Sequence, residues 1–363
     1  MNRRAFLIGA GGAAVLAGSG AVAWRSSIGS MADYDAYARR LRAPLAAQPQ
    51  PQVRELIRYA TLAANSHNTQ PWRFRVEGNA MDLMPDYGRR TSVVDPDDHH
   101  LFVSLGCAAE NLAIAAAAAG RPGEVEVTPS GVRVLLSTAP GRPDPLFDAI
   151  PKRQSTRADY DGRPVSAADL AMLERAAAMP GVRVILVTER ARIGRIRDLV
   201  VAGNHAQMAD PAFLRELKHW LRFNPRSAAA TGDGLFSAVS GNPVLPTVLG
   251  GPALDLFFTA QGEGDRYARQ IDSSAGLAIF VGERADREHW MRVGRACQRF
   301  ALTATSLGLK HAFVNQPVEV AGLRGALAAL IGEPGRRPDL VMRFGHGPTL
   351  PFSPRRPVDA VLA

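Results

Sequence analysis

The chain has 363 residues, of which 46% are hydrophobic and 21% charged, so it can bury a large core and is not a disordered polymer. Its two cysteines, Cys107 and Cys297, are too few for a disulfide framework, and we interpret them as packing residues of buried helices. The net charge of +9 comes mainly from scattered arginines, since only three of the 43 basic residues are lysine. No basic run interleaved with aromatic residues occurs, so no nucleic-acid partner is predicted.

The first 23 residues have the three parts of an export signal. Arg3 and Arg4 form a basic start, an uncharged apolar run follows from Ala5, and Ala21-Val22-Ala23 is a small-residue cleavage signal. The paired arginines and the five glycines resemble a twin-arginine (Tat) signal, so we expect export by the Tat translocase to the periplasm. The alternative is an uncleaved anchor that tethers the protein to the membrane, because the run of 19 residues is just long enough to cross a bilayer of about 30 Å.

After a polar arm at 24–50, a first half is expected over residues 51–145. Trp72, Phe74 and Val76 alternate with charged residues, which indicates a strand with one buried face. Residues 105–119 are rich in alanine and have almost no polar face, which predicts a helix buried in the core. The other elements predicted here are a helix over 53–64, a polar turn over 65–68 and a strand hairpin over 125–136.

A second half is expected over residues 146–350, with a basic tail at 351–363. Ser166 begins a helix, because Ser166-Ala167-Ala168-Asp169 has the spacing of a capping box. Glycine, serine and proline break the periodicity over 224–264, so no regular element is predicted there. The other predicted elements are strands at 182–187, 276–281 and 338–345, helices at 192–208 and 211–222, and a helix-turn-strand unit over 287–316.

A weak internal repeat links the two halves. Residues 106–120 align without gaps on residues 294–308, with matches at both glycines and at three pairs of alanines. Small residues let helices approach closely. The repeat therefore predicts two α+β halves, each built around one buried helix of small residues.

Hydrolytic and metal-binding motifs are missing from the sequence, which has no G-x-S-x-G elbow and no H-E-x-x-H. The remaining metal candidate is His99-His100, which follows Asp95, Asp97 and Asp98. Adjacent side chains on a helix or strand point apart, so we interpret this stretch as a solvated polar turn and predict no metal site.

Arg153, Ser155 and Arg157 form an R-x-S-x-R segment. Alternate side chains of an extended segment lie on one side, so two guanidinium groups and one hydroxyl can face the same anion. Arginine forks give bidentate hydrogen bonds to a phosphate dianion such as that of flavin mononucleotide (FMN). The alternative is a solvated turn in an arginine-rich protein.

Two loops carry amides that suit the pyrimidine edge of a flavin ring. Residues 66–72 lie between a predicted helix and a predicted strand, and Asn315-Gln316-Pro317 follows the second buried helix. The alternative is that these amides only satisfy the backbone of their own turns.

The order Ser66-x-Asn68-x-Gln70-Pro71-Trp72-x-Phe74 resembles the S-x-N-x-Q-P-W-x-F signature of the FMN-dependent nitroreductase fold. The R-x-S-x-R segment resembles the phosphate-binding segment of that family, and Arg355 and Arg356 lie where the family places further phosphate-binding cations. Together with the repeat, these features most resemble the Acg branch, in which one chain is similar to a fused nitroreductase dimer. The resemblance covers roughly residues 50–360.

The resemblance implies an α+β nitroreductase-like fold, a monomer that mimics a dimer, and one composite FMN site per chain. It also implies a lid over the flavin at 224–264, with Leu235 and Phe236 as apolar plugs; the alternative is a mobile surface insertion. The implied FMN ligands are Arg153, Ser155, Arg157, Arg355 and Arg356 for the phosphate, and Ser66, Asn68, Gln70, Asn315 and Gln316 for the ring, with Trp72 packed nearby.

The predicted function is that of an oxidoreductase in which FMN takes a hydride at N5, with NAD(P)H as the reductant, and passes electrons to a small-molecule acceptor. No side chain is expected to be catalytic, because the cofactor carries the chemistry. The rival is an exported flavin-binding protein that sequesters FMN without turnover. Export favours this rival, since reduced nicotinamide is a cytoplasmic reductant, whereas a membrane-linked donor would favour the enzyme.

Overall fold

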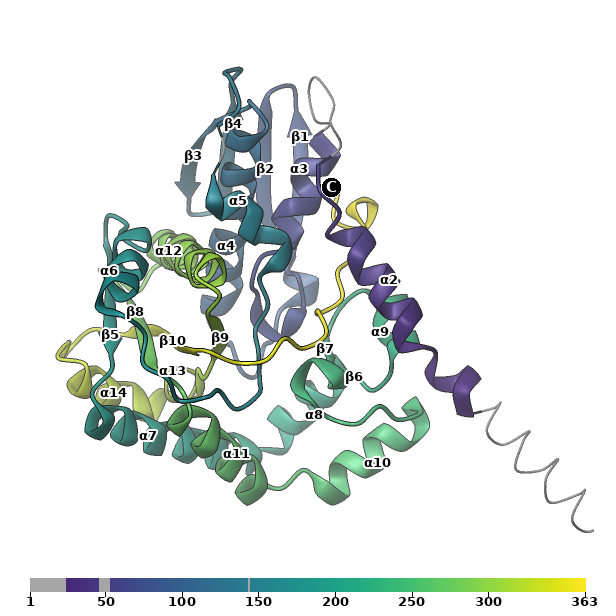
Figure 1. Cartoon of the computed structure of the whole chain (residues 1–363), viewed down its shortest axis with the longest axis vertical. Coiled ribbons are helices and arrows are strands. Elements are labelled where there is room, and N and C mark those ends of the chain that lie inside the picture. Colours follow the sequence, from purple (N-terminus) through teal and green to yellow (C-terminus); the bar gives the residue numbers. More distant parts are fainter. Residues whose placement is uncertain (1–23, 46–52, 143) are drawn as a thin grey trace, which may run out of the picture.

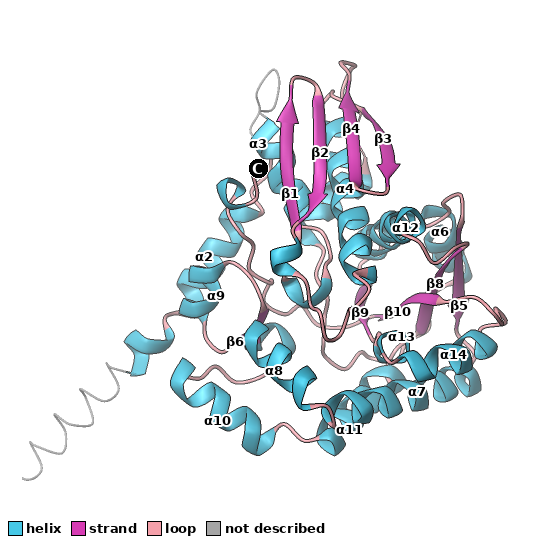
Figure 2. Ribbon diagram, turned by 180° about the vertical axis from the view of Figure 1, so that it is seen from behind, coloured by secondary structure: helices cyan, strands magenta, loops and turns pink. Residues whose placement is uncertain are grey.

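The structure is a computed structural model that describes residues 24–45, 53–142 and 144–363 (Figure 1). The predicted export signal, residues 1–23, lies outside the described residues. Two four-stranded antiparallel sheets are separated by two long helices, α4 (His99–Ala118) and α12 (Arg287–Ser306) (Figures 1 and 2). The predicted α+β class is therefore confirmed.

The first sheet has the strand order β1-β2-β4-β3, with β1 (Trp72–Glu77), β2 (Ala80–Pro85), β3 (Gly123–Thr128) and β4 (Gly131–Leu136). In β1 the buried Trp72 and Phe74 alternate with exposed Arg73 and Arg75, as predicted, although Val76 is exposed at the end of the strand. The buried face packs on α3 (Val53–Thr61) and on α4. The predicted hairpin over 125–136 is confirmed as β3 and β4.

The second sheet has the strand order β5-β8-β10-β9, with β5 (Val182–Val187), β8 (Gly276–Gly282), β9 (Lys310–Phe313) and β10 (Pro338–Gly345). β8 is buried along its whole length because both of its faces are covered. Ala278 and Phe280 share a core with α12, whereas Leu277, Ile279 and Val281 pack with α7 (Arg190–Met208) and α14 (Arg324–Leu330). This alternation follows the period of two of a strand.

The central helices α4 and α12 cross at two glycines. A Cβ on Gly106 would lie 1.9 Å from the carbonyl oxygen of Met291, and one on Gly294 would lie 2.0 Å from the carbonyl oxygen of Val103. Only glycine permits so close an approach of two backbones. The contact is reciprocal. Each glycine meets the backbone of the residue that lies three positions before the other glycine, Met291 before Gly294 and Val103 before Gly106. By length and composition α4 could cross a membrane, but it lies buried in the core.

The C-terminal segment is not a free basic tail. After β10 it runs back to the first sheet (yellow in Figure 1), where the amide of Phe74 donates to the carbonyl of Val361 at 2.8 Å. The amide of Ala363 in turn donates to the carbonyl of Phe74 at 2.9 Å. The segment therefore adds an edge contact beside β1.

Two stretches without predicted elements contain helices. The arm holds α2 (Met31–Leu41), which Ser30 caps and which buries Tyr34 and Ala38 one helical turn apart. The stretch 224–264 contains α9 (Pro225–Thr231), α10 (Thr247–Phe257) and the start of α11 (Ala260–Asp272). Helices form here despite the glycine and proline content because tertiary packing stabilises them. Gly250 of α10 is an example, since the ring of Phe223 occupies the space that a Cβ at this position would need.

The predicted helix start at Ser166 is confirmed, because its hydroxyl accepts from the amide of Asp169 at 3.1 Å. The remaining helices and strands are α5 (Pro145–Ala149), α6 (Ala167–Ala176), α8 (Pro211–Trp220), β6 (Leu221–Arg222), β7 (Leu235–Phe236) and α13 (Gln316–Glu319).

Candidate functional site

A cavity of about 480 Å³ has walls from both halves of the chain. Ser66 and Ser104 line it from the first half, and Arg157, Tyr267 and Gln316 line it from the second. One side is apolar and comes from α8, α10 and the segments beside them, with Phe213, Leu217, Phe223, Leu254 and Phe258. Small-molecule sites have volumes of about 300–1,000 Å³ and combine apolar walls with a few polar groups, as this cavity does.

Arg157 presents an unused cation to this cavity. Its guanidinium group makes no hydrogen bond or ion pair with any described residue, and burial lowers its pKa. Arg266 also lines the cavity, but it lies 3.6 Å from Glu263 and donates to Asn242 at 3.3 Å. Arg157 is therefore the cavity cation with donors available for an anionic ligand.

Arg153 is 4% exposed and only partly satisfied. Its Nη2 donates to the carbonyl of Leu62 at 3.0 Å, whereas Nε and Nη1 have no partner within the described ranges. Burial lowers its pKa. Burial also lowers the pKa of Arg42 and of Arg355, with a further contribution from the charge of Arg153. We call Arg42, Arg153 and Arg355 the arginine cluster; no carboxylate in the described part of the chain forms an ion pair with any of them.

Ser155 lies between the two arginines of the R-x-S-x-R segment. It is half-buried and pairs in parallel with His311 of β9, and the amide of the following Thr156 donates to the carbonyl of His311 at 2.8 Å. This extended pairing keeps the segment straight. The predicted segment thus holds two arginines with free donors, one at the cavity and one in the arginine cluster.

Arg355 differs from its predicted role as a phosphate ligand. All five of its N–H donors reach protein acceptors: the carbonyls of Thr61, Leu62, Ala63 and Pro354, and Oδ1 of Asn68. Arg356 is also engaged, since its guanidinium group donates to the carbonyls of Gln70 and Ala360. These bonds hold the C-terminal segment against the first half and leave Arg355 no free donor for a phosphate. That the two arginines bind a phosphate stays a prediction.

The loop at 66–72 divides into two parts. Ser66 and His67 line the cavity, whereas the amide of Asn68 donates to the carbonyls of Gly234 and Pro354, at 3.0 and 3.1 Å. Gln70 is fully buried, donates to the carbonyl of Gly232 at 2.8 Å and accepts from the amide of Arg356 at 2.9 Å. Neither amide lines the cavity. That they contact a flavin ring stays a prediction.

Trp72 is fully buried in the main core and does not line the cavity. The loop before it is strained, because His67, Asn68 and Gln70 have φ values of +47°, +54° and +53°. Residues other than glycine adopt this region at a cost and usually where function or tight packing requires it. The strained backbone turns Ser66 and His67 toward the cavity while Asn68 and Gln70 hold the C-terminal segment.

Asn315 and Gln316, which are predicted to contact a flavin ring, line the cavity. Oδ1 of Asn315 accepts from the amide of Val341 at 2.8 Å, and Oε1 of Gln316 is buried without a partner among the described residues. Gly203 of α7 sets the position of Gln316, since a Cβ there would lie 2.7 Å from Cβ of Gln316. Gln316 therefore offers an unused acceptor on a tightly packed wall.

Cys107 lines the cavity and its thiol donates to the carbonyl of Gly294 at 3.2 Å. Cys297 is fully buried, and burial, followed by the contact with Cys107, raises the pKa of its thiol. A thiol with a raised pKa is a poor nucleophile, which fits a packing role.

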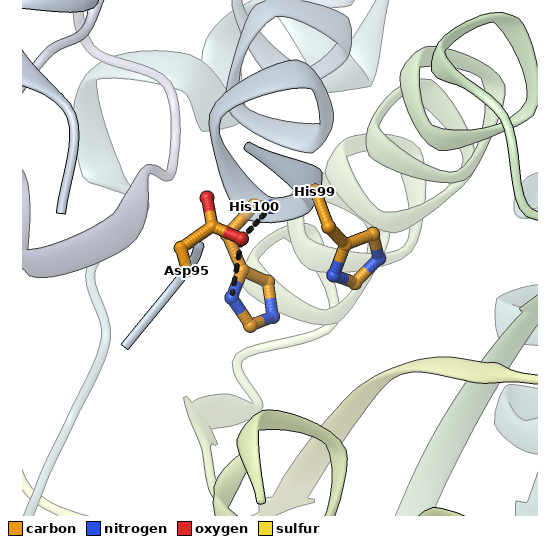
Figure 3. Close-up of side chains that lie close together, drawn as sticks. All are labelled: Asp95, His99 and His100. Carbon is orange, nitrogen blue, oxygen red and sulfur yellow. Dashed lines mark hydrogen bonds and ion pairs between the residues drawn. The ribbon is translucent and has the colours of Figure 1, made fainter. Parts of the chain in front are cut away.

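Asp95, His99 and His100 are buried, so the predicted solvated turn is wrong (Figure 3). The carboxylate of Asp95 accepts from the amides of His100 and Leu101, at 2.9 and 3.0 Å. This cap on the start of α4 draws both histidines into the interior.

Sequence reasoning missed several titratable groups at the cavity, among them His67, His100 and Glu319. Burial lowers the pKa of His67 to about 4, with a further contribution from Arg157. The Asp95 cap is the signal that could have placed His100. No local sequence pattern marks Glu319 in this way, because the pairing of strands in the second sheet is what places α13 at the cavity.

No protein-family model matches the chain. Over 331 residues the chain is 29% identical to the Mycobacterium tuberculosis protein named "Putative NAD(P)H nitroreductase Rv3131", which corresponds to 85% of this chain and 90% of that protein. Over 325 residues it is 23% identical to "Putative NAD(P)H nitroreductase acg" of the same species, covering 85% of this chain and 94% of that protein. The chain is thus distantly similar to proteins named as oxidoreductases.

Solved structures of nitroreductases also match part of the chain. A nitroreductase with bound FMN from Desulfitobacterium hafniense matches 59% of this chain and 94% of its own, with 16% identity and a TM-score of 0.38. The FMN-dependent nitroreductase NfnB from Mycobacterium smegmatis, in complex with NADPH, matches 56% of this chain and 87% of its own, with 14% identity and a TM-score of 0.37.

Proposed function

We propose that this chain is an FMN-dependent oxidoreductase of the nitroreductase type and that the cavity holds the flavin. The observation that carries the proposal is the pair of unused arginines, Arg157 at the cavity and Arg153 in the arginine cluster. Buried and half-buried charges are normally paired, so the unused donors of the buried Arg153 and the half-buried Arg157 support an anionic ligand from outside the chain. The FMN phosphate is a dianion with acceptors for both guanidinium groups, and the hydroxyl of Ser155 can join them.

The groups at the cavity also suit the flavin ring. Gln316 offers an unused acceptor, Ser66 offers a hydroxyl from the other half, and the apolar side of α8 and α10 can cover the flat ring. When bound, FMN would supply the hydride chemistry at N5, which these side chains cannot perform. The chain's own residues would bind the cofactor, orient it and keep water away from it.

NAD(P)H is the reductant we propose, with a small molecule as the acceptor, because the similar mycobacterial proteins are named NAD(P)H nitroreductases. The second candidate function is sequestration of FMN without turnover. It is favoured by the expected export, since reduced nicotinamide is a cytoplasmic reductant.

The full chain, purified and supplied with FMN, separates these functions. If the protein retains FMN and turns yellow, and NADH or NADPH bleaches its flavin absorbance under anaerobic conditions, the oxidoreductase function is supported. Yellow protein that neither reductant bleaches supports sequestration. Protein that remains colourless after incubation with FMN contradicts both.

We also propose that the two halves are related and share one composite site. The reciprocal contacts of Gly106 and Gly294 support this, because each glycine meets the backbone three positions before the other. The Leu235 and Phe236 side chains line the cavity, which supports a covering role for 224–264. A stoichiometry of one FMN per chain is the expected result, and two would contradict the composite site.

We further propose that the protein is exported and remains at the membrane surface. Support comes from α10, whose Val248, Leu256 and Phe257 are the most exposed large hydrophobic side chains of the described residues, at 80%, 70% and 77%. Such a patch indicates an apolar partner surface. The apolar run of 5–23 directly precedes Trp24, and Arg226 of α9 donates to the carbonyl of Ser26, which ties this end of the chain to the element before α10.

Flotation with phosphatidylcholine–phosphatidylglycerol vesicles tests the membrane contact. Val248→Glu with Leu256→Glu should reduce the vesicle-bound fraction of the full chain. Leu135→Glu, at an exposed apolar residue of β4, is the matched control and should leave it unchanged. Equal binding by both variants would contradict a role for α10, and a full-length chain confined to the cytoplasm of its host would contradict export.

A further inference from the structure

We propose that Asp95, His99 and His100 form a binding site for a divalent metal ion that prefers nitrogen and oxygen ligands, such as Zn²⁺ or Co²⁺. One ligand atom from each residue lies within 4.8 Å of the other two, and all three side chains are more than nine-tenths buried. Figure 3 shows the two rings side by side at the start of α4, with Asp95 on the far side of His100. The site is distinct from the groups proposed to hold FMN.

The independent observation is the state of the imidazole nitrogens. Nδ1 of His99 and both ring nitrogens of His100 have no hydrogen-bond partner among the described residues. A buried polar atom without a partner has lost its hydrogen bonds to water and gained none, so three of them in one place indicate a missing ligand. The lone pairs are also available, because burial lowers the pKa of both histidines to about 3 and keeps the rings neutral.

His99 is already oriented as metal-binding histidines are. Its Nε2 lies 2.9 Å from Oδ1 of Asp339, and the other oxygen of Asp339 accepts from the amide of Gly282 at 2.5 Å. A carboxylate that holds one ring nitrogen fixes the ring and directs the other nitrogen toward the metal. Nδ1 of His99 is thereby left as the ligand atom.

Charges of both signs surround the site. The carboxylates of Asp95, Asp97, Asp339 and Glu319 favour a cation there, whereas Arg337 and Arg324 oppose one, although Arg337 also pairs with Asp97. The four carboxylates would compensate the positive charge of a bound ion.

The ligand set and its access define the kind of ion. Two imidazoles and one carboxylate favour Zn²⁺, Co²⁺ or Fe²⁺ over Mg²⁺ and Ca²⁺, which prefer oxygen ligands. Ligands of a tetrahedral ion with bonds of about 2.0–2.2 Å lie about 3.4 Å apart, so binding would draw the side chains together by roughly 1–1.5 Å. His100 and Glu319 both line the cavity, which provides a path for the ion and an open coordination position.

Titration of the flavin-free full chain with CoCl₂ tests the site, because tetrahedral or five-coordinate Co²⁺ absorbs visible light much more strongly than the hydrated ion does. We expect one equivalent to bind with this spectrum, and His100→Gln and Asp95→Asn to weaken binding about 10–100-fold. His205→Gln, at an exposed histidine of α7, is the control and should bind as the wild type does.

Circular dichroism establishes that each variant is folded, and His99→Gln replaces any variant that is not. Absence of saturable binding by the wild type would overturn the proposal and leave ordered water as the partner of these nitrogens. Undiminished binding by folded His99→Gln and His100→Gln proteins would also overturn it. Because the titration uses protein without flavin, its outcome does not depend on the proposed FMN site.

Discussion

Arg355 and Arg157 both come from segments that suggest phosphate binding, but Arg355 is buried, Arg157 is half-buried, and their surroundings differ. All five donors of Arg355 reach acceptors of the protein, whereas the guanidinium group of Arg157 reaches no described residue. The first therefore holds the fold together, and the second is available to a ligand. The comparison teaches that an arginine is a ligand group only where the fold leaves its donors unused.

Arg355→Met tests the structural side of this comparison and has the largest expected effect. The carbonyls of Thr61, Leu62 and Ala63 lose buried donors, so the free energy of unfolding should fall by about 3 kcal/mol or more. Chemical denaturation of the flavin-free protein measures the change. Arg54→Met, which removes a surface ion pair with Asp359, should cost less than about 1 kcal/mol. Equal costs for the two variants would contradict the assignment.

This division of roles marks the limit of what the sequence predicts. Alternation in β1, the capping box at Ser166 and the small residues at the helix crossing depend on local spacing, and these predictions agree with the structure. The partners of Arg355 come from about 290 positions away, and no local pattern indicates them.

The candidate site shows the same limit. Of the four amides predicted to contact a flavin ring, those of Asn315 and Gln316 line the cavity, whereas Asn68 and Gln70 are held by the glycine segment at 232–234. That segment lies in a stretch for which the sequence predicts no regular element. Contacts between distant segments decide which amides of a motif face a ligand, and these contacts follow from packing rather than from spacing.

Gly203→Ala tests whether the cavity wall at Gln316 is rigid. The added Cβ would lie 2.7 Å from Cβ of Gln316 and 2.9 Å from its carbonyl carbon, so the backbone of α13 must move. We expect a loss of about 2 kcal/mol in the free energy of unfolding and weaker binding of FMN. Gly194→Ala on the same helix is the control, since its nearest neighbour would be 3.9 Å away, and it should stabilise the helix slightly. Identical behaviour of the two variants would show that the wall at Gln316 is not rigid.

The pH dependence of stability probes the surroundings of Arg153. His311 is fully buried there, and burial, with a further contribution from Arg153, lowers its pKa well below the ordinary value. Below pH about 6.5 the unfolded state therefore binds a proton that the folded state does not, so acid favours unfolding. This group should contribute a loss of about 1.4 kcal/mol per pH unit on acidification.

His311→Leu should remove that contribution, because leucine carries no titrating group. Denaturation at a series of pH values between about 7 and 5 measures the slope for both proteins. A variant whose stability falls with acid as steeply as that of the wild type would show that His311 is not held neutral beside Arg153.

The smallest expected effect on stability concerns the strained loop at 66–72, which lies between the cavity and the C-terminal segment that Arg355 holds. His67 has a φ of +47°, which glycine adopts freely, so His67→Gly should raise the free energy of unfolding by about 1 kcal/mol relative to His67→Ala. Both variants remove the same imidazole from the cavity wall, and their difference isolates the backbone. Thermal denaturation of the pair provides the measurement, and no difference between them would mean that the loop stores no strain.

Equilibrium titration of the full chain with FMN, followed by flavin fluorescence, tests the central claim most directly. The account predicts one FMN per chain and a loss of affinity of about 100-fold, or about 2.7 kcal/mol, for Arg157→Gln with little change in stability. Arg356→Gln, whose guanidinium group is engaged by the protein, should bind FMN nearly as the wild type does once it is folded. A wild type that binds no FMN, or an Arg157→Gln protein that binds it with undiminished affinity, would contradict the account.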